Sequence, residues 1–408
     1  MSDAALPLND SDLSALYRKD RFEMPEGLIY LDGNSLGPLP KTVPPRMADA
    51  VSRQWGNSLV KGWNEAGWFK LPSVVAAQLE PLIGAEPGSV AVGDSTSINL
   101  FKVLSAALKM SGSRRRILSD SGNFPSDLYI AEGLVSLVGS GFHLMALPSD
   151  KVEAAIGADV AVVMLTEVDY RTGQRRNMRS VTQAAHAAGA LVIWDLSHSA
   201  GALPVRLADC NADFAVGCGY KFLNGGPGAP AFLYVAPRHA ESLVPTLSGW
   251  MGHSAPFAFE SSYRPASGIE KMQAGTPPIL SLIAFSTALE LFKDLDLEAL
   301  HARSLQLGDL FIAEMARRCP YLELATPRDH RLRGSQVSFR HANGYEVMQA
   351  LIARDVIGDF RSPDIIRFGI TPLYISHDDI IRASATLEQI LRDRLWDTDT
   401  YRVRAAVT

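Results

Sequence analysis

The sequence predicts an α/β protein: a mainly parallel seven-stranded sheet sandwiched by helices, followed by a smaller α+β domain. Three observations predict this fold class. Short apolar runs alternate with helical patterns between residues 90 and 236. These runs are continuously apolar, as expected of parallel strands that helices cover on both faces. After about residue 280, the alternation gives way to longer helical patterns with fewer strands.

The large domain is expected over residues 46–285. Its strand candidates are seven apolar runs, at 89–93, 114–120, 142–148, 159–166, 190–195, 213–218 and 231–236. Its helix candidates are 97–110, 126–138 and 181–189. In the first of these helices, one apolar face is predicted from the spacing of Ile98, Phe101, Leu104 and Leu108.

The smaller domain is expected over residues 286–408. Around and within it, helices are predicted at 280–295, 299–318, 344–355 and 378–396, and strands at 332–341 and 364–370. Residues 1–45, rich in Pro and Gly, are expected to run back and join this domain. The segment 245–278 has no clear periodicity and is too long for a plain connection, so it is a candidate binding loop.

Composition excludes several classes of function. The 408 residues carry a net charge of −5, and the longest basic cluster is Arg114–Arg116, so no nucleic-acid footprint is present. The N-terminus lacks the apolar core of a signal peptide, and no 18-residue uncharged apolar run occurs, which predicts a cytoplasmic protein. Neither a disulfide framework nor a metal site is expected from the three cysteines, Cys210, Cys218 and Cys319.

Polar residues follow several of the predicted strands. Ligands of open α/β sheets collect at the carboxyl ends of the strands, so these residues are the candidates for a site. They are Thr96, Ser97, Phe124, Asp127, Thr166, Asp195, His198, Tyr220 and Lys221.

Lys221 and Asp195 each allow an ordinary interpretation and a functional one. Lys221 could be a surface lysine, and Asp195 could cap the next turn with His198 as a loop histidine. Alternatively, Lys221 is a buried, nucleophilic amine of the Schiff-base type between Gly-rich turns. A carboxylate at Asp195 could then keep a pyridine ring nitrogen protonated, which makes such a ring an electron sink.

The segment "DSTSINL" places Thr96 and Ser97 before a predicted helix. Ser97 suits the N-cap of that helix, but a helix N-terminus surrounded by hydroxyls also suits a phosphate. No GxxxxGK[ST] motif is present, which favours a phosphorylated cofactor over a nucleoside triphosphate. Phe124 could be a hydrophobic staple of its helix or could stack on a flat heterocycle.

Two spacings carry a resemblance to known enzymes. Asp195-x-x-His198 at one strand end, and Tyr220-Lys221 one βαβ step later, resemble the pyridoxal-phosphate (PLP) enzymes of the aspartate-aminotransferase fold, fold type I. Further signatures are similar to the kynureninase family in particular: "GNSLG" (33–37), "NFPSD" (123–127), "SGW" (248–250), "AGTPPIL" (274–280) and "IRFGITPLY" (366–374). The resemblance runs from about residue 28 to about residue 395.

This resemblance implies hydrolysis of L-kynurenine to anthranilate and L-alanine in tryptophan catabolism, with PLP as cofactor. It also implies a homodimer whose two subunits share their active sites. Animal-type enzymes, which favour 3-hydroxykynurenine, resemble this chain less around "KGWNEAGW" and carry Asn where this chain has Thr276. That difference favours plain L-kynurenine, with the 3-hydroxy form as a second possible substrate.

The resemblance also implies a role for each residue. Lys221 binds the cofactor aldehyde, Asp195 pairs with the ring nitrogen, Phe124 stacks on the ring, and Tyr220 is a further catalytic residue. The surroundings of the cofactor would be Asp127, His198 and Thr166, and the phosphate residues Thr96, Ser97, Tyr220, Trp250 and Thr276, the last two from the partner subunit. Arg367 would bind the substrate carboxylate, and Ser35 and Trp63 would lie near the substrate's aromatic ring.

Other fold-type-I enzymes are the alternatives. A cysteine desulfurase needs a nucleophilic cysteine on a mobile loop well after the lysine, whereas Cys210 and Cys218 precede Lys221 and Cys319 ends a predicted helix. An aminotransferase is not separated by residue types alone. A non-catalytic metabolite-binding module of the same fold would not need Lys221 as a buried amine.

Overall fold

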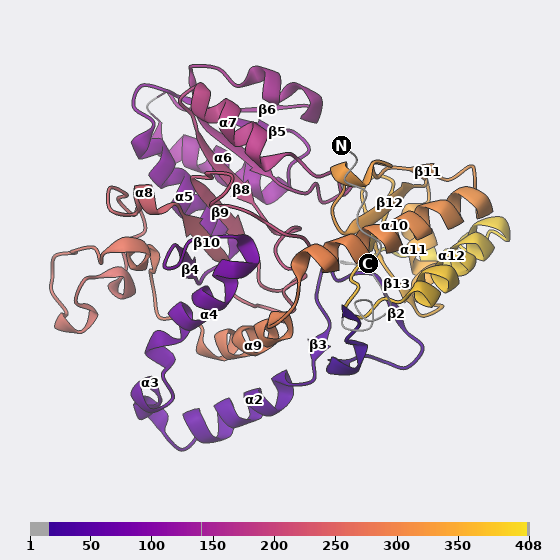
Figure 1. Ribbon diagram of the computed structural model, residues 1–408, viewed down its shortest axis with the longest axis horizontal. Coiled ribbons are helices and arrows are strands. Elements are labelled where there is room, and N and C mark those ends of the chain that lie inside the picture. The colour runs from indigo at the N-terminus through magenta and orange to yellow at the C-terminus, as the bar shows by residue number, and fades with distance from the viewer. Residues whose placement is uncertain (1–15, 140, 406–408) are drawn as a thin grey trace.

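A seven-stranded sheet forms the centre of the computed structural model, which describes residues 16–139 and 141–405 (Figure 1). Its strand order is β4-β10-β9-β8-β7-β5-β6. The strands are β4 (Val90–Val92), β5 (Arg116–Asp120), β6 (His143–Leu147), β7 (Val160–Thr166), β8 (Leu191–Asp195), β9 (Phe214–Gly217) and β10 (Phe232–Val235). Each lies inside or at the bounds of a run that the sequence predicted.

The sheet is parallel from β9 to β6, and β10 runs antiparallel to both of its neighbours. Successive residues along its strands enter two separate hydrophobic cores, Trp194 and Ala215 in one, Ile193 and Val216 in the other. Helices therefore cover both faces, which explains why the strands read as continuous apolar runs. The predicted fold class is confirmed.

Helices α5 and α6 pack on one face of the sheet, and α7, α4 and α9 contribute to the other side. The longer helices are α4 (Leu71–Leu79), α5 (Thr96–Met110), α6 (Pro125–Val138), α7 (Met178–Ala187), α9 (Ile279–Leu289), α10 (Leu297–Arg318), α11 (Gly344–Ile352) and α12 (His377–Arg392). The shorter helices are α2 (Val43–Asp49), α3 (Gly62–Glu65), α8 (Pro237–Ala240) and α13 (Asp399–Arg402).

The start of α5 corrects two sequence predictions. Its N-cap is Ser95, whose hydroxyl accepts a hydrogen bond from the backbone N–H of Ile98 (3.3 Å), so Ser97 belongs to the first turn. Extended backbone at Ser95 suits the cap better because a capping residue lies outside the helical region. Ile98 is exposed, unlike Leu104 and Leu108, because it points away from the sheet at the helix end.

A second sheet lies toward the C-terminus, with the antiparallel order β11-β12-β15-β14. Its strands are β11 (Glu323–Leu324), β12 (Gln336–Arg340), β14 (Asp359–Arg361) and β15 (Ile365–Gly369). Two-stranded pairs join β1 (Phe22–Glu23) to β3 (Leu39–Pro40) and β2 (Ile29–Tyr30) to β13 (Val356–Ile357). Strands β13 and β14 were not predicted, because two or three residues show no period.

The pairing of β2 with β13 brings the N-terminal segment beside the C-terminal half of the chain. Residues 1–15 of the predicted joining segment lie outside the described residues. The predicted domain boundaries, after residue 45 and after residue 285, stay a prediction.

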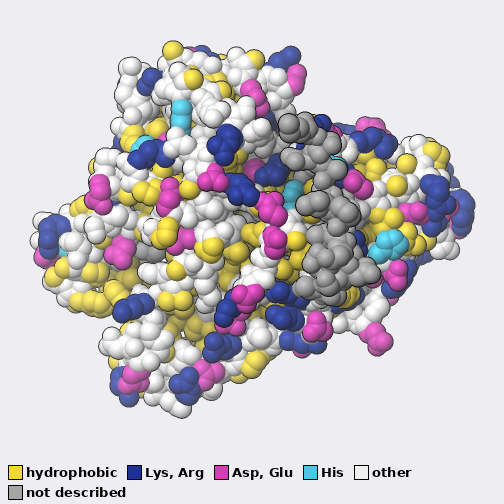
Figure 2. Space-filling model, in the orientation of Figure 1, with side chains coloured by type: hydrophobic (Ala, Val, Ile, Leu, Met, Phe, Trp, Pro, Cys, Tyr) yellow, Lys and Arg dark blue, Asp and Glu magenta, His cyan; other side chains and the backbone are white. Residues whose placement is uncertain are grey.

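Two segments project from the body in Figure 1. One is an arm formed by α2, the π-helical turn η2 (Ala50–Trp55) and α3; the other is 245–278, which carries the 3-10 turns η8 (Trp250–Gly252), η9 (Pro256–Ala258) and η10 (Gly268–Met272). Hydrophobic side chains gather in the hollow between the arm and the body (Figure 2). Within the described part of the chain, no helix is both long and apolar enough to cross a membrane.

Candidate active site

A cavity of about 390 Å³ lies where β7 and β8 end and where the turn after β9 and the start of α5 and α6 meet. Nine of the predicted cofactor residues line this single cavity: Thr96, Ser97, Phe124, Asp127, Thr166, Asp195, His198, Tyr220 and Lys221. Because parallel strands end at the same edge of the sheet, residues up to 125 positions apart meet there.

Lys221 follows β9 by four residues, and its side chain contacts His198 in the wall of the cavity. Its Nζ lies 3.0 Å from His198 Nε2 and 5.8 Å from the centre of the Phe124 ring. The lysine is half-buried rather than fully buried as its sequence context suggested, because its amine opens onto the cavity.

The His198 ring is buried, and burial together with the Lys221 charge holds its pKa well below the usual value. A neutral imidazole accepts from Lys221 at Nε2 and carries its proton on Nδ1. That Nδ1 atom is buried and has no hydrogen-bond partner among the described residues. A buried N–H without a partner in a residue that lines the cavity is a candidate donor to a bound ligand.

Two buried carboxyl groups, Asp195 and Asp127, share the floor of the cavity. The pKa of Asp195 is raised by burial, and that of Asp127 is raised by burial and by the Asp195 charge. Lys221 is the cation that lowers both. A protonated ring nitrogen would bring a second positive charge to these carboxylates, so they fit the pyridine ring of PLP.

Ser197 orients the Asp195 carboxylate. Asp195 Oδ1 accepts from the Ser197 backbone N–H (2.8 Å) and from its hydroxyl (2.6 Å). Both bonds fall on one oxygen, so Oδ2 is left available for a further donor. The carboxylate is therefore fixed before any ligand is bound.

The opposite end of the cavity is the first turn of α5. Thr96 and Ser97 lie there half-buried, and Ser95 caps the same turn. The free N–H groups and the positive end of the dipole of this 15-residue helix favour an anion. Hydroxyls beside that helix end fit the phosphate of PLP.

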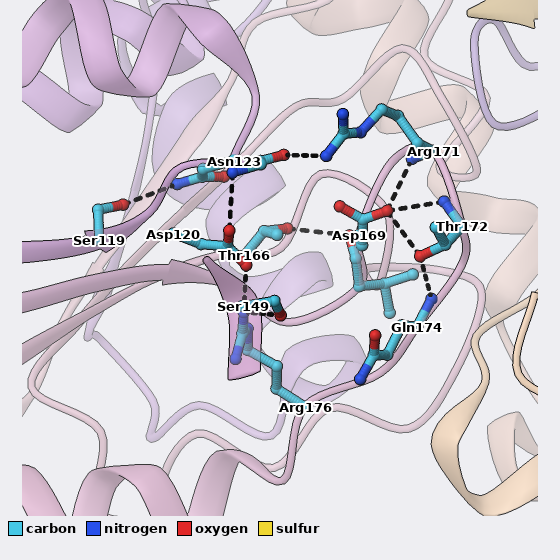
Figure 3. Close-up of polar contacts among 12 residues, drawn as sticks. Ser119, Asp120, Asn123, Ser149, Thr166, Asp169, Arg171, Thr172, Gln174 and Arg176 are labelled. Carbon is cyan, nitrogen blue, oxygen red and sulfur yellow. Dashed lines mark hydrogen bonds and ion pairs between the residues drawn. The ribbon is translucent and has the colours of Figure 1, made fainter. Parts of the chain in front are cut away.

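The loop 169–176, beside the cavity wall that carries Phe124, is held in place by side-chain hydrogen bonds. Figure 3 shows Asp169 accepting from Thr172 through both its backbone N–H and its hydroxyl, at 2.7 Å each, and from the Arg171 N–H at 3.1 Å. In the same view Arg176 donates to Asp120 and, at 2.6 Å, to Ser149.

Tyr170, in that loop, contacts both Phe124 and Arg367. Its ring packs edge-on against Phe124, with ring centres 5.2 Å apart, and its backbone carbonyl accepts from Arg367 Nη1 at 2.6 Å. Phe124 itself is the residue before α6 and is 40% exposed, since one face of its ring opens toward the cavity. The loop therefore links the cofactor wall to the arginine.

Arg367 stands in a group of charged residues beside the cavity. It is fully buried on β15, and its Nη2 donates to Asp359 Oδ2 (2.6 Å) and to the Ser35 hydroxyl (2.7 Å). Ser35 in turn donates to Asp359 Oδ2 at 2.6 Å. The predicted substrate residues Arg367 and Ser35 are thus in direct contact, although they are 332 positions apart.

The segment carrying Ser35 is seated against the lysine turn through Gly37. The Gly37 N–H donates to the Tyr220 carbonyl at 2.8 Å, and a Cβ at this glycine would lie 2.5 Å from the Lys221 carbonyl oxygen. No larger side chain fits such a close approach of two backbones.

Five predicted residues do not line the cavity: Arg367 and Ser35, which belong to the charged group beside it, and Trp63, Trp250 and Thr276. Trp63 on α3 packs edge-on against Trp68, Trp250 packs against Phe257, and Thr276 is exposed. For Trp250 and Thr276 this agrees with the expectation that a partner subunit supplies them. Trp63 belongs to the projecting arm, so its predicted place near the substrate is not reached within one chain.

Sequence reasoning missed several residues that line the cavity. They are Asp94, Ser95, Ser126, Tyr170, Ser197 and Cys218. Ser95, Ser126 and Ser197 adjoin predicted residues, so a wider window at each strand end would have included them. Tyr170 follows β7 inside an irregular loop and gave no signal. Among the described residues no group of His, Cys, Asp and Glu could hold a metal ion.

The sheet topology and the cavity define a fold-type-I enzyme that uses pyridoxal phosphate. Solved structures share this fold: apo cysteine desulfurase from Thermococcus onnurineus has a TM-score of 0.78 at 17% identity, covering 92% of this chain and 97% of its own. A C-DES mutant with glycine covalently linked to its PLP cofactor has a TM-score of 0.77 at 15% identity, covering 94% of this chain and 99% of its own.

Closer relatives narrow this class. The kynureninase of Deinococcus radiodurans is 53% identical over 92% of this chain and 93% of its own length. That of Burkholderia pseudomallei is 48% identical over 99% of both chains. Residues 300–387 also match the family model described as kynureninase C-terminal domain. The chain belongs to the kynureninase family.

Proposed function

We propose that the hydrolysis of L-kynurenine to anthranilate and L-alanine, which this enzyme performs with pyridoxal phosphate, depends on Lys221 as the residue that binds the cofactor aldehyde. The observation that carries this assignment is the shared cavity. Lys221, the Asp195 carboxylate and the first turn of α5 border it together, as an amine, a ring-nitrogen partner and a phosphate site must.

Bound pyridoxal phosphate supplies an electron sink for the carbanion left when the substrate loses its α-proton. The chain's own groups do the rest. Asp195 would accept a hydrogen bond from the ring N–H, and the Phe124 ring would support one face of the cofactor. Thr96 and Ser97 would donate to the phosphate, and His198, Thr166 and Asp127 would line the rest of the site.

Lys221 Nζ is the base that takes the α-proton, since the amine that holds the cofactor stays within reach of the same carbon. His198 accepts a hydrogen bond from this amine and fixes its direction. Burial raises the pKa of Tyr220, so its hydroxyl keeps its proton and acts as a donor beside Lys221. Arg367 binds the substrate α-carboxylate, and Ser35 lies toward the substrate's aromatic ring. Trp63, on the projecting arm, would reach a substrate ring only across a subunit boundary.

We further propose that the active enzyme is a homodimer in which Trp250 and Thr276 reach the phosphate of the neighbouring subunit. Both residues are exposed here and lie outside their own chain's cavity. The projecting segments that would meet the partner expose large apolar residues, such as Val60 (76% exposed) and Phe259 (80%). Apolar surface of this kind favours association. A cytoplasmic location also stays a prediction.

The fold-level alternative of cysteine desulfurase has less support. Cys218 does line the cavity, but it is buried in the floor beside Ser197, and burial raises the pKa of its thiol. A neutral, enclosed thiol is a poor nucleophile. An aminotransferase would form a keto acid instead of anthranilate, which the assay below distinguishes.

The test is Lys221→Ala, assayed for anthranilate release and for the visible absorbance of bound cofactor. Both are expected to disappear together, while circular dichroism stays that of the wild type. Lys109→Ala is the control, because Lys109 is an exposed lysine in the last turn of α5 and does not line the cavity. Normal anthranilate release by Lys221→Ala refutes the assignment.

A further inference from the structure

We infer that Asp359 is a positioning residue that holds the Arg367 guanidinium ready for the α-carboxylate of the substrate. This inference rests on the proposed role of Arg367 in carboxylate binding. It extends that role to a residue on a neighbouring strand that the sequence patterns did not single out.

Strand pairing fixes the two residues opposite each other. Asp359 on β14 and Arg367 on β15 are direct partners in the antiparallel register, so their side chains leave the same face of the small sheet. Both side chains are almost fully buried, 2% and 1% exposed. Their ion pair is therefore set by the fold rather than by free rotation of surface side chains.

One carboxylate oxygen organises the whole group. Asp359 Oδ2 accepts from Arg367 Nη2, from Arg361 Nη2 and from the Ser35 hydroxyl, each at 2.6 Å. The Tyr170 carbonyl holds the other arm of Arg367, at Nη1. The guanidinium is thus fixed at two of its three nitrogens.

The third nitrogen is left open. Arg367 Nε is buried and has no hydrogen-bond partner among the described residues. A buried N–H of a charged group seldom stays unpaired, so a ligand acceptor is expected at this edge. A carboxylate would accept one charge-assisted bond from this Nε–H, because both Nη2 hydrogens already donate, to Asp359 and to Ser35.

The charges in the group support the same conclusion. Two guanidinium groups, of Arg361 and Arg367, share the single Asp359 carboxylate. Burial and the Asp359 charge raise the pKa of the nearby Asp32 carboxyl to about 7, so Asp32 is largely protonated below neutral pH and adds little negative charge there. The group then has room for one more anion. Without Asp359, Arg367 would be a buried cation held only by the Tyr170 carbonyl and the Ser35 hydroxyl, with no hydrogen-bonded carboxylate to fix its orientation.

A purely structural role for the ion pair is the competing explanation. It predicts that loss of Asp359 weakens the fold or affects every ligand alike. A positioning role predicts a loss that depends on the ligand's carboxylate. The two differ in how binding of L-kynurenine changes relative to an analogue that lacks the carboxylate.

The experiment uses holoenzyme carrying Asp359→Asn, with L-kynurenine as substrate and its decarboxylated amine as competitive inhibitor. We expect KM for L-kynurenine to rise roughly tenfold to a hundredfold, with kcat within about threefold of wild type. The inhibition constant of the decarboxylated amine should change less than about twofold, since that ligand does not reach Arg367. Asp359→Glu, which keeps the charge, should recover part of the lost affinity.

The matched control is Asp364→Asn. Asp364 lies beside the same small sheet and pairs with Arg340, at 3.0 Å for both carboxylate oxygens, but away from the cavity. It should leave both constants unchanged. If Asp359→Asn does not fold, Ser35→Ala replaces it, because the Ser35 hydroxyl bridges the same two groups; KM is then expected to rise about threefold, again for L-kynurenine alone.

Arg367→Met separates the inference from the proposed function beneath it. If Arg367→Met weakens L-kynurenine selectively but neither Asp359→Asn nor Ser35→Ala does, the positioning role of Asp359 is wrong and the role of Arg367 stands. If Arg367→Met affects both ligands equally, the carboxylate-binding role itself is wrong. An equal loss for both ligands in Asp359→Asn also overturns the inference.

Discussion

The cofactor cavity and the arginine group beside it are assembled in opposite ways. The cavity is built from the strand ends of one sheet and leaves groups short of partners, such as the His198 Nδ1 atom and the Asp195 and Asp127 carboxyl groups, whose pKa values burial raises. The arginine group, by which we mean Asp32, Ser35, Asp359, Arg361 and Arg367, comes from two distant parts of the chain. Its two guanidinium groups are already oriented, because both pair with the Asp359 carboxylate.

This difference in construction fits the two ligands, a cofactor in the cavity and a substrate carboxylate at the arginine group. A cofactor that stays bound can supply the positive charge and the hydrogen bonds that the cavity lacks. Those interactions then contribute to the affinity for the cofactor. A substrate arrives and leaves in every turnover, so its carboxylate needs a guanidinium that is already oriented. Variants of both regions test this contrast.

The proposed pairing of Asp195 with the ring nitrogen is tested by Asp195→Asn. Loss of the carboxylate removes the partner of the ring nitrogen, so turnover should fall roughly a hundredfold to ten-thousandfold while the cofactor stays bound. The measurements are anthranilate release and the rate of α-proton exchange in D2O. Asp159→Asn, at an exposed acid paired with Arg116 before β7, is the control and should keep full activity. An unchanged exchange rate in Asp195→Asn would remove the ring-nitrogen role.

Mixed dimers test whether the cavity is complete within one chain. Lys221→Ala and Trp250→Ala proteins are each expected to have low activity, because one lacks the amine and the other lacks a predicted phosphate contact from the partner. In an equal mixture, half of the dimers are hybrids with one intact site, so activity should recover to about one quarter of wild type. Activity no greater than the mean of the two separate proteins would show that the sites are not shared.

The cavity was largely predictable from the sequence, since each strand and its trailing polar residues are local features. Thr166 and Asp195 end continuous apolar runs and Lys221 follows one, and such runs are visible in the sequence. The parallel topology then brings the three residues to one edge of the sheet. Ser97 was misassigned as the N-cap because Ser95 and Ser97 have equal capping propensity, and only the backbone conformation separates them.

The arginine group was not predictable in the same way. Ser35 and Arg367 were found only through the resemblance to a family, and Asp359 gave no signal at all. Asp359 lies on the three-residue strand β14. It faces Arg367 only because of the register between β14 and β15, which the turn at 362–364 sets. Residues such as Trp63, Trp250 and Thr276 show a further limit, because a chain's own pattern says nothing about a neighbouring subunit.

Tyr170 joins the two regions, so its variants test whether they can be separated. Tyr170→Ala removes the ring that packs on Phe124 but keeps the backbone carbonyl that holds Arg367. Cofactor affinity is expected to fall about threefold to tenfold, because the Phe124 ring loses its edge-on support. KM for L-kynurenine, measured with saturating cofactor, should stay within about twofold. A large rise in KM with unchanged cofactor affinity would mean that the ring serves the arginine group instead.

Asp32→Asn tests the charge balance of the arginine group through stability, where the smallest effect is expected. Burial and the Asp359 carboxylate raise the pKa of Asp32 to about 7, against a weaker opposing effect of Ser35, Arg367 and Arg361. A carboxyl group whose pKa is raised by folding stabilises the protein at low pH. That contribution is lost as the pH rises through the folded pKa, because the unfolded chain ionises near its usual value.

Wild-type enzyme should therefore lose stability relative to Asp32→Asn between about pH 4 and pH 7, with a relative change in Tm of a few degrees. Thermal unfolding of both holoenzymes across this range measures the effect. Asp20→Asn serves as the control because Asp20, in the 3-10 turn η1 (Lys19–Arg21), lies away from the group, so its Tm should follow the wild type at every pH. Parallel curves for Asp32→Asn and wild type would mean that Asp32 ionises normally, and the arginine group would then be neutral rather than ready for one more anion.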